Sequence, residues 1–177
     1  MIAGPLGSAL SVRTIAGAGE AETCARIMAT SEPWITLGRG YDASLAAVSD
    51  PDREVLVAVH GGRVIGFAVL AMRGGFAGYV QAIGVDAGYR SLGVGRALLT
   101  RIEERVFAVT PNVFLCVSSF NLRGRAFYEA NGYRHVGTIE DYVVAGHDEL
   151  IMRKTMGPMA TFRPADRAPT SDVPGQP

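Results

Sequence analysis

The chain has 177 residues, of which 48% are hydrophobic and 19% charged, a composition typical of one globular domain with a substantial core. Its 17 basic and 17 acidic residues cancel, which disfavours binding of the whole protein to nucleic acid or to an anionic membrane. No apolar run approaches the length of a membrane span, so we expect a soluble domain that holds any anionic ligand locally.

Two features favour the cytoplasm. Residues 1–10 have neither a basic n-region nor a continuous apolar run, which argues against a secretory signal. The cysteines, Cys24 and Cys116, fit a reducing compartment better than a disulfide scaffold. The histidines are too scattered for metal-ligand spacing, so no metal is expected.

The composition divides the chain into three parts. Residues 1–8 are rich in glycine and small residues and are predicted to form a flexible N-terminus. Residues 156–177 collect prolines among small polar residues and are predicted to form a disordered tail. The working domain is therefore expected at residues 9–155.

The first half of this domain is predicted to contain a strand, two helices and a β-hairpin. These elements are expected at 10–15, 20–30, 41–48 and, for the hairpin, 54–60 with 63–72. The break at Ser31-Glu32-Pro33 stops the first helix, and Gly61-Gly62 forms the two-residue hairpin turn.

The second half alternates strands and helices. A strand at 79–85 leads into a helix whose apolar residues recur every four positions, at Val94, Leu98, Ile102 and Val106. Further elements are expected at 113–117 (strand), 122–130 (helix), and 133–144 with 149–154 (strand pair). Asn131-Gly132 closes the last helix. The order indicates a mixed α/β domain without internal repeats.

The segment Arg90-Ser91-Leu92-Gly93-Val94-Gly95 lies between a strand end and the first turn of this amphipathic helix. Its glycines allow close approach of a ligand, and the N–H groups from Gly93 to Arg96 point outward at the positive end of the helix dipole. Such a helix start binds phosphate. The Walker pattern fails because no Gly-Lys-Ser/Thr follows, and Leu98 stands where the dinucleotide fingerprint needs a small residue.

The segment resembles the Arg/Gln-x-x-Gly-x-Gly/Ala motif of the GNAT superfamily of N-acetyltransferases. The resemblance extends to Asn121, Ala126-Phe127-Tyr128-Glu129 and Asn131-Gly132-Tyr133, and covers about residues 10–154. It implies an α/β (α+β) GNAT fold, with a mixed, mostly antiparallel sheet, flanking helices and a splay between the fourth and fifth strands. It also implies direct transfer of an acetyl group from acetyl-CoA to an amine of a small molecule or a protein.

The resemblance also assigns roles to residues. Main-chain groups of Ile83, Gly84 and Val85 occupy the positions that hold the acetyl-pantetheine arm in the family. Residues Arg90 to Arg96 would bind the pyrophosphate, with a charge-assisted contact from Arg90. Asn121 would contact the cofactor arm, or act only as a helix N-cap. Tyr128 matches the family's general acid, which protonates the departing thiolate, although a role in core packing is the alternative.

The general base is not identified by the sequence. Some relatives that modify protein N-termini carry a glutamate on the fifth strand, where this chain has Cys116, which we interpret as a buried free thiol. Candidates that would act through water are Glu32, Asp141, His147 and Glu149. An apolar acceptor pocket is expected from Trp34, Ile35, Tyr41 and Tyr142.

Several alternatives stay open at this stage. The missing fifth-strand carboxylate leaves room for a sensor or pseudoenzyme that binds CoA or acyl-CoA without turnover. Larger acyl groups than acetyl and a homodimeric assembly are equally open. The acceptor amine itself is not identified.

Overall fold

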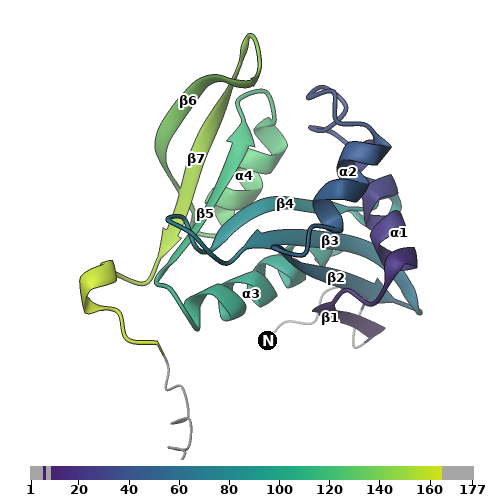
Figure 1. Ribbon diagram of the computed structural model, residues 1–177, viewed down its shortest axis with the longest axis horizontal. Helices are drawn as coiled ribbons and strands as arrows, with labels where there is room; N and C mark the ends of the chain where they lie inside the picture. Colours follow the sequence, from purple (N-terminus) through teal and green to yellow (C-terminus); the bar gives the residue numbers. More distant parts are fainter. Residues whose placement is uncertain (1–5, 7–8, 165–177) are drawn as a thin grey trace, which may run out of the picture.

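The computed structural model of the protein describes residue 6 and residues 9–164 (Figure 1). Its strands and helices are β1 (Leu10–Thr14), α1 (Ala18–Ala29), α2 (Tyr41–Val48), β2 (Glu54–His60), β3 (Arg63–Ala71), β4 (Tyr79–Val85), α3 (Val94–Phe107), β5 (Asn112–Ser118), α4 (Leu122–Ala130), β6 (Arg134–Val144) and β7 (His147–Thr155). Single 3₁₀ turns lie at η2 (Ala87–Tyr89) and η3 (Met159–Thr161). Every predicted strand and helix is present, with boundaries shifted by two residues at most.

The strands form one seven-stranded sheet in the order β1-β2-β3-β4-β5-β7-β6. All neighbouring strands are antiparallel except β4 and β5, which run parallel. The parallel pair is short, because only Tyr79 with Phe114 and Val80 with Leu115 are in register. The hairpin of β6 and β7 therefore stands away from the layer of β1 to β4 (Figure 1). The predicted mixed sheet and its splay between the fourth and fifth strands are confirmed.

A β-bulge lies in β4 at the point where the splay begins. Against β3, Leu70 is in register with Val80 whereas the preceding residue, Val69, is in register with Ala82, so Gln81 is the extra residue. Arg53 holds this residue by donating a hydrogen bond from Nε to Gln81 Oε1 (2.8 Å). Beyond the bulge, β4 has no strand partner on its β5 side among the described residues.

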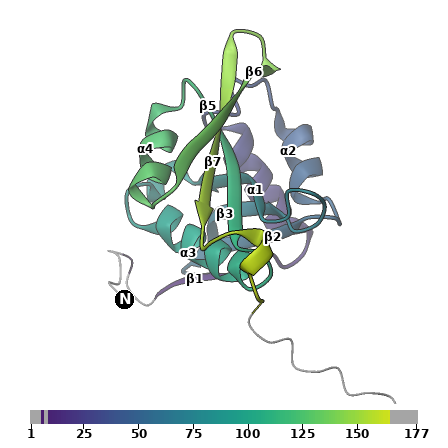
Figure 2. The ribbon, with the colours of Figure 1, turned by 90° about the vertical axis from the view of Figure 1, so that its left-hand side faces the viewer.

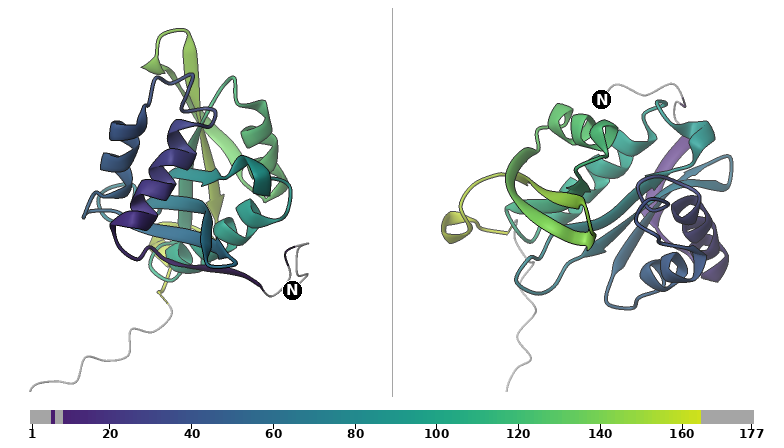
Figure 3. Two further views of the ribbon diagram at one scale, coloured as in Figure 1. Left: turned by 90° about the vertical axis from the view of Figure 1, so that its right-hand side faces the viewer. Right: turned by 90° about the horizontal axis from the view of Figure 1, so that it is seen from above.

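Helices cover both faces of the sheet (Figures 2 and 3). On one face, Met28 of α1 packs with Phe67 and Val69 of β3. On the other, the predicted apolar residues of α3, Val94, Leu98, Ile102 and Val106, are all buried. Burial of each such side chain contributes roughly 1.5–3 kcal/mol to folding stability. The apolar residues at four-residue spacing therefore account for a large part of the packing of α3 on the sheet. None of the helices in the described part of the chain is long and apolar enough to span a membrane.

The chain continues to contact the domain beyond residue 155. The N–H of Met156 donates to Pro111 O (2.9 Å), and Thr110 Oγ1 donates to the sulfur of Met159 in η3 (3.6 Å). Leu6 also packs against the core. The rest of the predicted flexible N-terminus and residues 165–177 of the predicted tail lie outside the described residues.

Candidate active site

The loop before α3 has the geometry of an anion-binding helix start. Ser91 (φ 63°) and Gly93 (φ 87°) both adopt left-handed backbone conformations, and Gly93 is the N-cap of α3. The first helical hydrogen bond runs from Ala97 N to Gly93 O (3.0 Å). The N–H groups of Val94 to Arg96 therefore have no acceptor within the helix and carry its positive dipole end.

Helix α4 packs against this loop and against the first turn of α3. A Cβ atom on Gly95 would lie 3.4 Å from Cζ of Phe127, so a small residue lets the two helices approach closely. Arg123 Nη2 donates to Ser91 Oγ (2.9 Å), which adds a positive charge beside the loop. The sequence motif did not indicate Arg123, and no local pattern marks it, because its position depends on how α4 packs.

The side chain of Arg90 turns back toward the end of β4. Its Nε donates to Val85 O (3.2 Å) and its Nη2 to Ser31 Oγ (2.9 Å). Arg90 thus connects the loop to β4 and to the end of α1. The pyrophosphate contact suggested for it stays a prediction.

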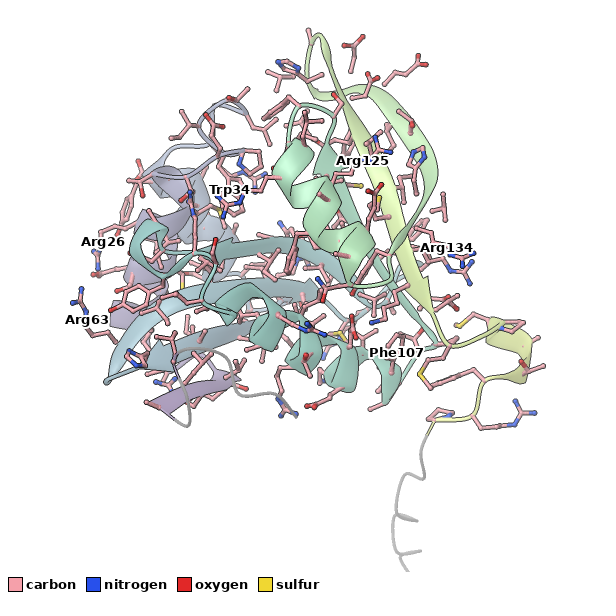
Figure 4. All side chains as sticks on the ribbon, turned by 180° about the vertical axis from the view of Figure 1, so that it is seen from behind. Arg26, Trp34, Arg63, Phe107, Arg125 and Arg134 are labelled. Atoms are coloured by element: carbon pink, nitrogen blue, oxygen red, sulfur yellow. The ribbon has the colours of Figure 1, made fainter. Side chains whose placement is uncertain are left out.

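A cavity of about 310 Å³ opens beside the splay. It is lined by residues of the loop between α1 and α2, of the segment before β2, of β4 and β5, of α4 and its N-cap, and of the β6–β7 hairpin. Among them are Trp34, Tyr79, Ile83, Cys116, Asn121, Tyr128, Tyr142 and Glu149. Figure 4 shows Trp34 on the inner side of its loop, facing the side of the molecule that carries α4. Of the four predicted acceptor-pocket residues, Trp34 and Tyr142 line the cavity. Ile35 and Tyr41 do not, since their side chains are turned to solvent and are 55% and 37% exposed.

Tyr128 is buried at the wall of this cavity and is 7% exposed. Its ring packs between Phe127 and Tyr133, at centroid distances of 5.3 and 5.7 Å. Burial raises the pKa of its hydroxyl, so the phenol is protonated at neutral pH. Tyr128 therefore both packs in the core and lines the cavity. Its role as an acid stays a prediction.

Asn121 is the N-cap of α4. Its Oδ1 accepts a hydrogen bond from the N–H of Gly124 (2.9 Å), and the same side chain lines the cavity. The capping role is confirmed. Contact of this amide with a cofactor stays a prediction.

Glu149 places a carboxylate in the cavity. It lies on β7 in register with Ser118 of β5, whose hydroxyl donates to Glu149 Oε1 (2.5 Å). The side chain is only 5% exposed, and burial raises its pKa, an effect that the Ser118 hydrogen bond partly offsets. The fifth strand lacks a carboxylate, as the sequence indicated. The neighbouring strand β7 supplies one, Glu149, opposite the last residue of β5.

The other candidate bases lie outside the cavity lining. Glu32 is exposed and accepts from Thr36 N (3.2 Å), and Asp141 accepts from Gly146 N (2.5 Å) in the hairpin turn. His147 is half-buried against Phe120, at a centroid distance of 4.8 Å. Their positions leave Glu149 as the candidate that shares a cavity with Tyr128.

Cys116 is half-buried in the cavity wall, more accessible than the sequence suggested. Burial raises the pKa of its thiol, which keeps the sulfur protonated and weakly nucleophilic at neutral pH. A protonated thiol gives no support to a covalent acyl intermediate on Cys116. Among the described residues, no group of three or more His, Cys, Asp or Glu side chains is arranged to hold a metal ion.

The model of the acetyltransferase (GNAT) family matches residues 21–133, from α1 to the end of α4. This match covers more than half of the chain and includes the splay, the helix start and Tyr128. The chain belongs to the GNAT acetyltransferase family. The predicted GNAT fold, the acyltransferase class and the dependence on acetyl-CoA are thereby confirmed.

Relatives of this GNAT acetyltransferase differ in their acceptors. The N-alpha-acetyltransferase RimI of Mycobacterium tuberculosis is 31% identical over 141 residues, which cover 77% of this chain and 85% of the relative. The fold is similar to that of an aminoglycoside 6'-N-acetyltransferase complexed with coenzyme A (TM-score 0.69, 16% identity, 84% and 98% of the two chains). It is also similar to the ribosomal-protein-S18-alanine N-acetyltransferase of Escherichia coli (TM-score 0.65, 18% identity, 87% and 99%).

Proposed function

We propose that this GNAT acetyltransferase acetylates a primary amine held in the cavity between Glu149 and Tyr128. The observation that carries the proposal is the meeting of these two side chains, from β7 and α4, in one cavity beside the splay. One is a carboxylate whose pKa burial raises, and the other is a phenol that burial keeps protonated. Such a pair, with pKa values displaced by their surroundings, is suited to acid–base catalysis.

The residues around the splay fit the cosubstrate. The β5-facing backbone of Ile83 to Val85 has no strand partner among the described residues. The carbonyl of Val85 accepts from Arg90 Nε, and the remaining polar groups on this side are available to the pantetheine arm. The helix start at Arg90 to Arg96 suits the pyrophosphate, and the amide of Asn121 suits the arm. Gly84 is required by packing, since a Cβ there would lie 2.5 Å from Cε1 of Phe67. Acetyl-CoA supplies the acetyl group as a thioester.

The side chains of the cavity supply the proton transfers. Glu149 accepts the proton that the amine loses as its nitrogen forms the new bond to the acetyl carbon. Tyr128 Oη donates a proton to the sulfur as the carbon–sulfur bond breaks. A backbone N–H near Val85 polarises the acetyl carbonyl. Each proton transfer by a positioned side chain contributes roughly 10²–10⁴-fold in rate.

The alternative of a sensor without turnover depended on the missing carboxylate. Glu149 removes that argument, because it supplies a carboxylate in register with the end of the fifth strand. The two solved structures named above are an aminoglycoside and a ribosomal-protein-alanine N-acetyltransferase, so both protein and small-molecule amines are within the range of this fold.

Thermal denaturation with acetyl-CoA and with CoA tests the cofactor site. A ligand at 100 times its dissociation constant stabilises the fold by about 2.7 kcal/mol, which raises Tm measurably. In Tyr128→Phe we expect these ligands to raise Tm as much as in the unchanged protein, while turnover falls by at least about tenfold. Tyr41→Phe, which changes a tyrosine outside the cavity lining, is the matched control. Absence of a Tm shift contradicts the cofactor site, and full turnover in Tyr128→Phe contradicts the acid.

A further inference from the structure

Arg39 is a cavity residue that the catalytic proposal does not use. It lies at the end of the loop between α1 and α2, where its main-chain N–H donates to Trp34 O (2.9 Å), and both residues line the cavity. The residue is half-buried and lines the cavity. Within the described part of the chain, its guanidinium has neither a hydrogen bond nor an ion pair. A partly desolvated guanidinium without a partner favours an anionic ligand.

Arg53 brings a second guanidinium to the same cavity, just before β2. Its Nε is bonded to Gln81 and lies 3.7 Å from Asp50 Oδ2, while Nη1 is 3.4 Å from Asp52 O. Nη2 has no partner among the residues that the structure describes. Gln81 thus orients the guanidinium plane of Arg53 and leaves Nη2 free to donate to a ligand.

The charges of the cavity come from different sides of the splay. Glu149 lies on β7, which pairs with β5, whereas Arg39 precedes α2 and Arg53 precedes β2. An acceptor that places its amine beside Glu149 therefore meets positive charge at its other end. A molecule with an amine and a carboxylate a few bonds apart matches both charges.

We propose that the acceptor is a small amine that carries a carboxylate, of the amino-acid type, and that Arg39 and Arg53 bind this carboxylate. The inference rests on the proposed function, because it concerns the acceptor of the same site. A polypeptide N-terminus is disfavoured, since the carboxylate of its first residue is consumed in an amide and offers no anion to the two guanidinium groups. The cavity volume of about 310 Å³ also suits a small acceptor.

Trp34 gives a binding signal that is independent of turnover. It is the single tryptophan of the chain, and it lines the cavity at 7% exposure. Its fluorescence is titrated in the presence of CoA with L-alanine, L-methionine and L-phenylalanine, with their C-terminal amides, and with an amidated tetrapeptide that begins with alanine. We expect at least one free acid to bind roughly tenfold or more tightly than its amide. Equal or tighter binding of the amides or of the peptide overturns the proposal, as does absence of binding by every acid.

Substitution of Arg39 locates the carboxylate. In Arg39→Gln we expect the dissociation constant of the acid to rise roughly tenfold or more while that of the amide is unchanged. Arg39→Lys keeps the charge without the planar fork, so its dissociation constant for the acid should lie between those of the unchanged protein and of Arg39→Gln. Arg26→Gln is the matched control, because Arg26 lies on the outer side of α1, away from Trp34 (Figure 4). An equal effect on acid and amide overturns the assignment of Arg39.

Turnover separates this inference from the proposed function. Acids that bind in an Arg39-dependent way but are not acetylated would support the anionic acceptor site and contradict the transferase mechanism. Acetylation of amides or peptides without acid preference would support the transferase and contradict the anionic acceptor.

Discussion

Glu149 is a carboxylate that the fold holds at 5% exposure with the Ser118 hydroxyl as its hydrogen-bond partner. Because burial raises its pKa above the ordinary value of 4.5, the folded state binds a proton more readily than the unfolded state. Its contribution to stability is therefore fully present below pH 4.5 and is lost as pH rises through the raised pKa. Above the raised pKa, the ionised side chain opposes folding.

Glu149→Gln should consequently separate activity from stability. We expect kcat/KM at neutral pH to fall by at least about tenfold, and the acidic limb of its pH profile to disappear. Tm at neutral pH should stay equal or rise, because the amide has no charge to desolvate. Glu140→Gln, at an exposed position on β6, is the control. Persistence of the acidic limb in Glu149→Gln would show that another group is the base.

At the scale of elements, the start of α3 depends on a left-handed residue. Ala at Gly93 (φ 87°) costs about 1 kcal/mol of backbone strain, which lowers Tm by a few degrees. Gly74 in the β3–β4 connection has φ 86°, so Gly74→Ala carries a similar strain at the end of β3 that lies opposite to the ligand loop. We expect both variants to lose stability, and only Gly93→Ala to weaken acetyl-CoA binding in calorimetry. Equal affinities in the two variants would contradict the anion site.

The elements could be predicted because their signals are local. The apolar spacing of α3 and the Gly61-Gly62 turn lie within a few residues of the structure that they determine. The 3₁₀ turn at Met159–Thr161 was missed because a Met–Thr110 contact stabilises it across 49 residues of sequence. Proline-rich composition describes only the local preference of that segment.

In the site, too, the features that local signals determine could be predicted and those that depend on long-range contacts could not. Tyr128 and the helix start were predicted from motifs, whereas the position of Glu149 follows from the pairing of β7 with β5. A one-residue change of that register would turn Glu149 to the other face of the sheet. The cavity positions of Arg39 and Arg53, and the turn of Arg90 toward Ser31, likewise depend on contacts between distant segments.

At the scale of the whole molecule, the sheet consists of two parts joined by a short seam. Strands β1 to β4 form one part and β5, β7 and β6 the other, and the β4–β5 seam contains only two residue pairs in register. The proposed cosubstrate residues lie on both sides of the splay, at Ile83 to Val85 and at Asn121. Binding should therefore order the open end of the sheet without changing its closed side.

Hydrogen exchange measured with and without acetyl-CoA tests this arrangement. We expect slower exchange in peptides that cover residues 79–96 and 118–128, because amides that lack a strand or helix partner gain one. Peptides from the β2–β3 hairpin, which is already paired along its length, should exchange at unchanged rates and serve as the internal reference. Slowing spread evenly over the molecule, or confined to the hairpin of β6 and β7, would contradict binding in the splay.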